Sequence, residues 1–439
     1  MKAYYFSECP YPDAWSDADK GAIRVTYPNR LFDPKVGADL INYRLDEWCL
    51  ADELGMNIMI NEHRSSTTCI TASCIPPAAM LARQTKNARI LLLGPTVGMR
   101  RDPVGLAEEV AYIDCVSRGR IDLGLLKGYS AEIAPSNMNP ATTEARYWEA
   151  HDLVIKALSH RDGPFNWEGE HFQYRQVNIW PRPYQEPCPP IWISCFSVRS
   201  AAEVANRGHN VVAALDSKMA ANIFGAYRKR VIELGQPAPS FTKFGYMALV
   251  AVANTRDEAL QRLAKVRGWV WSSGVSPPQF TNPPGYIPVA GNVEMMKNFP
   301  EEISWTHRVV GRSGRTFNPS VDPVENLIDS GMGFAGTPDE VFAQTERTVL
   351  RSRRLRAFAC DDARRRSRSS RSCGQHDALL EGSSPAVSRI SEGRREGRYH
   401  SSGNPSESRL KGYVCRLVKC VWQPCADLTT STSLWRRRK

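Results

Sequence analysis

The sequence predicts an α/β protein whose first 350 residues are built around a parallel sheet. Short apolar runs alternate with helical stretches, which is the pattern of βα units. Capping residues and glycines flank several of the helical stretches. The strand-like runs number seven, too many for a minimal nucleotide-binding fold and one short of an eight-stranded βα barrel.

The first half of the chain supplies four of the expected strands. In chain order, strands are predicted at 2–7, 56–60, 89–95 and 120–126, with helices at 35–55, 77–86 and 102–119. The third helix has the clearest signals. Asp102 is expected as its N-cap, Pro103 at its first position and Gly119 at its end.

The second half continues the alternation. A helix is expected at 142–160, a hairpin at 165–185 and further strands at 190–195, 210–215 and 245–254, with helices at 198–208, 217–235 and 255–266. Residues 268–336 are rich in Pro, Gly, Ser and Trp and are predicted to form a long insertion that acts as a lid. Thr337 is expected to cap another helix.

The chain changes character after residue 350. Residues 351–439 carry 21 Lys and Arg against 8 Asp and Glu, which leaves 36 against 38 in residues 1–350. The basic charge of the whole chain, +11, therefore belongs to this tail. Two interpretations stay open: an Arg/Ser segment that binds nucleic acid, or a shifted reading frame that replaces the last strand and helix. In the second case only "LRAFAC" could form a weak eighth strand.

The remaining composition predicts a cytoplasmic protein with reduced thiols. No apolar run approaches the ~18 residues of a membrane span, and the opening "MKAYYFSECPYPDAW" has no apolar signal-peptide core. Of the 12 cysteines, seven lie before residue 351 and five after it, at scattered spacings. No zinc motif matches these spacings, so no metal site is expected.

One short stretch points to chemistry. In "GMNIMINEHRSS" the apolar run ends abruptly in Glu62, His63 and Arg64. The carboxyl end of a strand in a parallel α/β protein is where catalytic groups sit. His63 is suited to acid–base work near neutral pH, with Glu62 as a supporting neighbour. A simple strand cap is the alternative.

Several motifs, in order, make residues 1–350 resemble the bacterial-luciferase-like, flavin-dependent monooxygenases. They are "NEHR", "LARQTKNARILLLGPTV", "DPVGLAEEVAYIDCVSRGRIDLGLLKGY", "FNWEGEHFQYRQVNIWPRPYQEPCPPIWIS" and "GTPDEV". The resemblance implies a TIM-type (βα)8 barrel, possibly incomplete at strand eight. It also implies a homodimer that binds FMN or a deazaflavin at the carboxyl ends of the strands. Where this chain has Arg64 the family often has a second histidine.

The resemblance also implies cofactor-binding residues. Lys127, Gly128 and Tyr129 follow the fourth strand where the family touches the flavin, and a cation there can meet the FMN phosphate. Ser197 and Ser200 lie at an expected helix N-terminus, which can bind phosphate or be an ordinary cap.

Three further residues are expected near the flavin ring: Ala78 and Ala79, where family members often carry a non-proline cis peptide, and Thr96, just past the third strand. The alternatives are a Pro-started helix for the alanines and a turn role for Thr96.

Three functions follow as hypotheses. The first is a monooxygenase that takes reduced FMN from a separate reductase and uses O2 to oxygenate a small organic substrate. The second is a deazaflavin-dependent oxidoreductase of the same superfamily that transfers hydride. The third is an inactive barrel, opened at its edges by the altered C-terminus, with nucleic acid bound at most through the tail.

Overall fold

The structure is a computed structural model that describes residues 2–14, 23–214, 216–273, 276–287, 289, 292–293 and 309–348. The tail at 351–439, including "LRAFAC", lies outside the described residues. The predictions made for the tail therefore stay predictions.

Seven parallel strands form the main sheet, in the order β1-β2-β3-β4-β7-β8-β9. All seven fall where the apolar runs predict strands. Their bounds are β1 Tyr4–Phe6, β2 Asn57–Ile60, β3 Ile90–Leu92, β4 Ile121–Gly124, β7 Ile191–Ser194, β8 Asn210–Ala214 and β9 Phe244–Met247. Strand order follows chain order, as expected of successive βα units.

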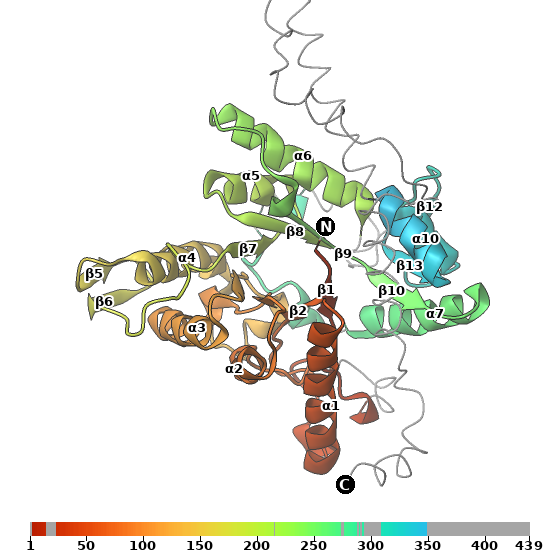
Figure 1. The fold of residues 1–439 in the computed structure, drawn as a ribbon, viewed down its shortest axis with the longest axis horizontal. Coiled ribbons are helices and arrows are strands. Elements are labelled where there is room, and N and C mark those ends of the chain that lie inside the picture. The colour runs from red at the N-terminus through yellow and green to blue at the C-terminus, as the bar shows by residue number, and fades with distance from the viewer. Residues whose placement is uncertain are drawn as a thin grey trace, which may run out of the picture.

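Helices connect successive strands and cover the outside of the curled sheet (Figure 1). They are α1 Pro34–Glu53, α2 Ile75–Gln84, α3 Pro103–Ser117, α4 Thr143–Ser159, α5 Val198–Asn206 and α6 Ser217–Glu233. The predicted start of α3 is confirmed, because the Asp102 carboxylate accepts a hydrogen bond of 2.8 Å from the backbone N–H of Gly105. A predicted hairpin is also confirmed as β5 Phe165–Glu168 and β6 Gln173–Val177.

The strands are apolar on both faces because both faces are buried. In β2, Ile58 and Ile60 pack with the surrounding helices in the main core, whereas Met59 between them points the other way. Met59 belongs to a separate cluster of side chains on the other face of the sheet. We call this cluster the inner layer. Its members are Met59, Leu91, Leu93 and Val212, with the partly buried Tyr4, Phe6, Leu126, Trp192 and Met247.

The prediction that an eighth strand is due after residue 350 falls on residues outside those that the structure describes. After β9, the chain passes through Ala248 into β10, Leu249–Val252, which pairs in parallel with β13, Gly333–Gly336. The end of the 268–336 segment, which was expected to be insertion throughout, thus includes a strand, β13, that belongs to a two-stranded sheet separate from the main one. Four residues of sequence Gly-Phe-Ala-Gly carry no strand pattern, so the sequence could not reveal it.

A side chain covers the free edge of β13. The amide of Gln344, in the predicted helix (residues 338–348), accepts from the Ala335 N–H at 3.0 Å and donates to the Ala335 carbonyl at 2.8 Å. It thereby satisfies backbone groups that a further strand would otherwise pair. Among the described residues, no ladder joins β13 to β1.

The rest of the second half is built from small elements. Helix α7, Arg256–Ser273, follows β10, and the short α8, Pro278–Thr281, comes after it. The hairpin β11 Val309–Val310 and β12 Thr316–Phe317 and the helix α10 Glu325–Ser330 then lead into β13. Helices α7 and α10 gather with β12 and β13 on one side of the sheet (Figure 1).

Candidate active site

Three ionisable side chains meet beyond the carboxyl ends of β1, β2 and β4. His63 follows β2, and its Nδ1 lies 2.9 Å from Oε1 of Glu132. Its Nε2 lies 3.8 Å from Oε1 of Glu8, too far for a direct hydrogen bond. We call Glu8, His63 and Glu132 the strand-end triad. The position of His63 is the one the abrupt end of the apolar run predicts.

Glu132 holds the imidazole in place. Its side chain is 2% exposed, and the carboxylate also accepts hydrogen bonds from the backbone N–H groups of Arg64 at 3.1 Å and Tyr129 at 3.0 Å. Burial acts to raise the pKa of Glu132, but the hydrogen bond and charge of His63 and these backbone donors together hold it below its ordinary value. A carboxylate facing Nδ1 makes that nitrogen the donor and leaves Nε2 free to accept or release a proton.

The pKa of Glu8 is shifted in the opposite direction from the pKa of Glu132. Burial raises the pKa of Glu8, and His63 and Arg24 nearby offset only part of that effect. Among the described residues, its Oε2 is buried without a hydrogen-bond partner. A carboxyl with a raised pKa can act as a proton donor, so the strand-end triad joins an acid to a histidine.

Sequence reasoning missed both carboxylates. Glu8 directly follows the first strand-like run, and Glu132 lies six residues beyond the run that forms β4. An acidic residue at the end of a buried strand was therefore an available signal for Glu8. For Glu132 the sequence offers only a single acid in a loop whose other charged residue is Lys127.

Glu62, the predicted supporting neighbour, has a positioning role in the structure. Its carboxylate accepts from the N–H of Cys74 at 3.1 Å and from the N–H of Thr96 at 3.1 Å. The Arg100 guanidinium lies 3.5 Å from the same carboxylate. Glu62 therefore fastens the loop after β2 to the start of α2 and to the loop after β3. Direct catalytic action by Glu62 stays a prediction.

Thr96, predicted at the flavin edge, is 3% exposed and already engaged. Its N–H and its hydroxyl, at 3.4 Å, both face Glu62. An isolated parallel bridge pairs it with Leu126 just after β4. Thr96 thus aligns the ends of β3 and β4, and a contact with a cofactor remains a prediction.

Lys127, Gly128 and Tyr129 lie at the end of β4, as predicted, and residues from the expected lid cover them. The Lys127 ammonium lies 4.5 Å from the centre of the Tyr286 ring, and burial lowers the pKa of Lys127. The Tyr286 hydroxyl donates to the Gly128 carbonyl at 2.9 Å. Gly128 adopts a φ of +96°, a conformation that glycine reaches without strain.

A second contact fixes the same cover. The Ser130 hydroxyl donates to the carbonyl of Thr281, at the end of α8, at 2.6 Å. The described residues 276–287 therefore lie over the loop after β4, where a lid over the strand ends was expected.

The alanines predicted near the flavin ring lie in α2. Ala78 is fully buried in the main core and Ala79 is exposed. The expected cis peptide is wrong for this segment, because the chain here is a Pro-started helix and the cis bonds among the described residues both precede prolines, at Trp180-Pro181 and Glu186-Pro187. Two prolines in the first turn make the helix the favoured local structure.

Ser197 and Ser200 form a helix cap. Ser197 is the N-cap of α5, and its hydroxyl accepts from the Ser200 N–H at 3.2 Å. The two hydroxyl oxygens are 2.9 Å apart. The capping alternative is thus seen directly, and phosphate binding by the exposed turn stays a prediction.

The Glu132 carboxylate makes a stability prediction possible. Glu132→Gln should lower the free energy of unfolding at pH 7 by about 1–3 kcal/mol, because the new NH2 must face a backbone N–H. The pKa of Glu132 is depressed by folding, so its contribution is full above its ordinary value of 4.5 and is lost as the pH falls through the lower folded value. Urea denaturation at pH 7 and pH 3 should show the gap between wild type and variant shrinking at pH 3. A difference in unfolding free energy that is the same at pH 7 and pH 3 would contradict the depressed pKa of Glu132.

The architecture is that of a parallel βα enzyme with acid–base groups at the carboxyl ends of its strands. The sequence matches the luciferase-like monooxygenase family over residues 34–352, so the chain belongs to this family. The resemblance stated from the motifs is thereby confirmed.

Individual relatives are more distant. The oxygenase component of the flavin-dependent trigonelline monooxygenase of Acinetobacter baylyi is 30% identical over 185 residues, 42% of this chain and 51% of that protein. The uncharacterized protein y4wF of Sinorhizobium fredii is 27% identical over 186 residues, 42% of this chain and 54% of that protein. The chain thus spans about half the length of these curated relatives.

Solved structures support the fold. The monooxygenase RslO1 from Streptomyces bottropensis has a TM-score of 0.54 at 19% identity, covering 70% of this chain and 82% of that one. The oxygenating constituent of 3,6-diketocamphane monooxygenase from Pseudomonas putida has a TM-score of 0.53 at 20% identity, covering 71% of this chain and 83% of that one.

Two further findings concern the described residues alone. No helix there combines the length and apolar composition that crossing a membrane needs. No three His, Cys, Asp or Glu side chains in the same residues gather as metal ligands would.

Proposed function

We propose that this chain is the oxygenase component of a two-component flavin-dependent monooxygenase. It would receive reduced FMN from a separate flavin reductase and use O2 to oxygenate a small organic substrate. The observation that carries the proposal is the strand-end triad, a histidine held by a buried carboxylate at the mouth of a luciferase-like sheet. The relative named as the oxygenase component of a trigonelline monooxygenase supports it, as does the diketocamphane enzyme structure described in complex with FMN.

The residues present fit a flavin. The inner layer offers an apolar floor, and Trp192 within it has a buried ring N–H without a partner among the described residues. Lys127 and the N-terminus of α5 with Ser197 and Ser200 would hold the phosphate. The small Gly128 lets a ligand approach the backbone closely. When bound, the reduced flavin supplies the electrons for O2.

The chain's own residues would control protons and water. Glu132 keeps the hydrogen on His63 Nδ1, so that Nε2 can exchange a proton with the reacting groups. Glu8 can return a proton because its pKa is raised. The cover formed by residues 276–287 would exclude water from the strand ends. We further propose that the curled sheet belongs to a barrel of the (βα)8 type and that the chain forms a homodimer.

Hydride transfer with a deazaflavin is the second candidate. An F420-dependent secondary alcohol dehydrogenase shares the fold, with a TM-score of 0.52 at 15% identity, and the strand-end triad suits either chemistry. The third hypothesis, an inactive barrel, depends on the tail, which lies outside the described residues.

Anaerobic titration of the full-length protein with reduced FMN, oxidised FMN and a deazaflavin tests the proposal. We expect the tightest binding for reduced FMN. Lys127→Gln should weaken FMN binding about tenfold while leaving riboflavin, which lacks the phosphate, unchanged. Tighter binding of the deazaflavin would favour the second candidate. No binding of any of them to folded protein would reject both.

A further inference from the structure

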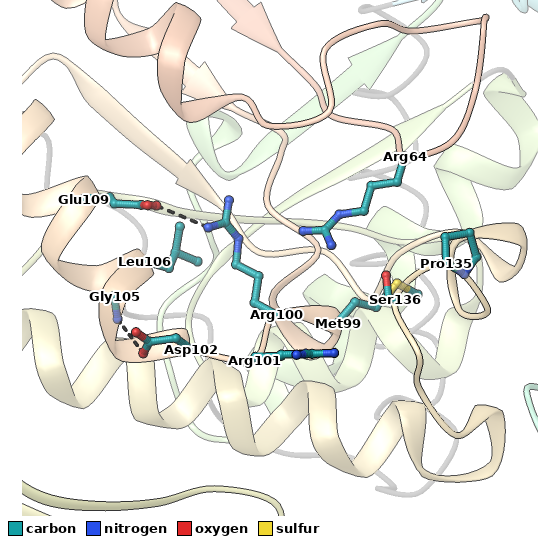
Figure 2. A pocket seen from close by; sticks show the side chains of 10 residues that line it. All are labelled: Arg64, Met99, Arg100, Arg101, Asp102, Gly105, Leu106, Glu109, Pro135 and Ser136. Atoms are coloured by element: carbon teal, nitrogen blue, oxygen red, sulfur yellow. Dashed lines mark hydrogen bonds and ion pairs between the residues drawn. The ribbon is translucent and has the colours of Figure 1, made fainter. Parts of the chain in front are cut away.

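A pocket of about 440 Å³ lies beside the strand-end triad, on the outer side of the loops that follow β2, β3 and β4. It is lined by Arg64, Pro135 and Ser136, by the loop residues 99–102 and by the first turns of α3 (Figure 2). This volume falls within the range of small-molecule sites, about 300–1,000 Å³. Three arginines, Arg64, Arg100 and Arg101, give the pocket its chemical character.

The charges in this pocket are unevenly balanced. Arg100 is paired with Glu109, 3.2 Å away, and with Glu62. Asp102 is engaged as the cap of α3 and accepts a hydrogen bond of 2.9 Å from the Tyr174 hydroxyl. That leaves Arg64 and Arg101, and in the described part of the chain neither forms an ion pair.

The same pocket contains buried polar atoms without partners. The Nε atom of Arg64 and the hydroxyl of Ser136 are buried and make no hydrogen bond to any described residue. Ser136 is only 7% exposed. Figure 2 shows the Arg64 side chain extending from its loop into the pocket. Buried donors of this kind are costly unless a ligand or water satisfies them, so their clustering at the guanidinium of Arg64, which is unpaired among the described residues, indicates an absent anionic partner. Arg101, which is exposed to solvent, lines the same pocket.

We propose that this pocket binds a small organic anion through its carboxylate or phosphate group. The guanidinium groups of Arg64 and Arg101 provide the charge, since their planar donors match both oxyanions. The Ser136 hydroxyl supplies a further donor. The site is separate from the phosphate position proposed at Lys127 and α5, and the inference does not depend on the proposed flavin chemistry.

Calorimetric titration of the full-length protein tests the proposal, with benzoate and inorganic phosphate as probes. Chloride at matched ionic strength controls for general screening. We expect saturable binding of one equivalent of at least one probe, and the tighter probe identifies the preferred group. Arg64→Gln and Arg101→Gln should each weaken that binding about tenfold or more. Ser136→Ala, which removes a hydroxyl with no partner, should weaken it without disturbing the fold.

Arg83→Gln is the matched control, because Arg83 is exposed on α2 and does not line the pocket. Binding should also persist in the presence of saturating FMN. The proposal would be overturned by the absence of saturable binding of both probes, by equal affinity in all variants, or by displacement with FMN. If no flavin binds at all, the proposed function fails while this measurement still stands.

Discussion

Replacing His63 by Asn should lower the turnover number by about 10²–10⁴-fold, the usual contribution of a positioned acid–base group. An Asn amide can still donate to Glu132 from the place of Nδ1, but it has no atom at the place of Nε2. The variant should therefore fold normally and bind reduced FMN while losing proton transfer. Single-turnover oxidation with preformed reduced FMN measures this directly, without any contribution from the reductase.

A second histidine provides the control. His171 lies in the turn between β5 and β6, well separated in sequence from the strand-end triad, and His171→Asn should leave turnover within about twofold of wild type. Equal losses in the two variants would indicate general destabilisation. Full activity of His63→Asn would show that His63 is not the acid–base group. The fold and the family membership do not depend on that result.

Short apolar runs made the seven strands of the main sheet predictable, whereas β13 depends on tertiary structure. A run such as "MNIMI" is buried on both faces of a parallel sheet, so its continuous apolar composition is enough to predict a strand. Residues 333–336 contain two glycines and no β-branched side chain. They form β13 because β10 and the side chain of Gln344 supply partners on its two edges.

The residues of the candidate site also differ in whether the sequence alone could predict them. His63 could be predicted because it ends a buried strand, a purely local signal. Glu132 is 69 residues away in sequence, and only the neighbouring loops of a folded sheet bring it to His63. Glu62, the predicted supporting neighbour, shows that a carboxylate at a strand end can be fully engaged by backbone N–H groups. Local sequence cannot tell a reacting carboxylate from one that holds loops together.

The phrase "SRGR", part of the family resemblance, has a structural explanation. Arg118 and Gly119 end α3 with left-handed φ values of 54° and 82°. The chain then places Arg120 so that its guanidinium donates to the Thr85 hydroxyl and to four backbone carbonyls, those of Ala82, Thr85, Ala88 and Ser117. One side chain therefore joins the end of α2, the entry to β3 and the end of α3.

Arg120→Met should accordingly lower the free energy of unfolding by about 3 kcal/mol. Methionine preserves much of the aliphatic volume, but the carbonyls lose a charged donor, and their desolvation is then uncompensated. Burial lowers the pKa of Arg120 and the charge of Asp52 opposes that effect, while the surrounding acceptors give the partly buried guanidinium its hydrogen bonds. Urea denaturation should show a lower midpoint with an unchanged slope, since the native and unfolded chains keep their exposed areas.

Arg118→Met is the matched control, two residues away in the same phrase. Arg118 is exposed, and methionine can adopt its backbone conformation about as readily as arginine, so the expected change is within about 0.5 kcal/mol. A similar loss in both variants would mean that general charge at the end of α3 supports the fold. A loss confined to Arg120→Met would show that the phrase marks a structural junction at the amino ends of β3 and β4.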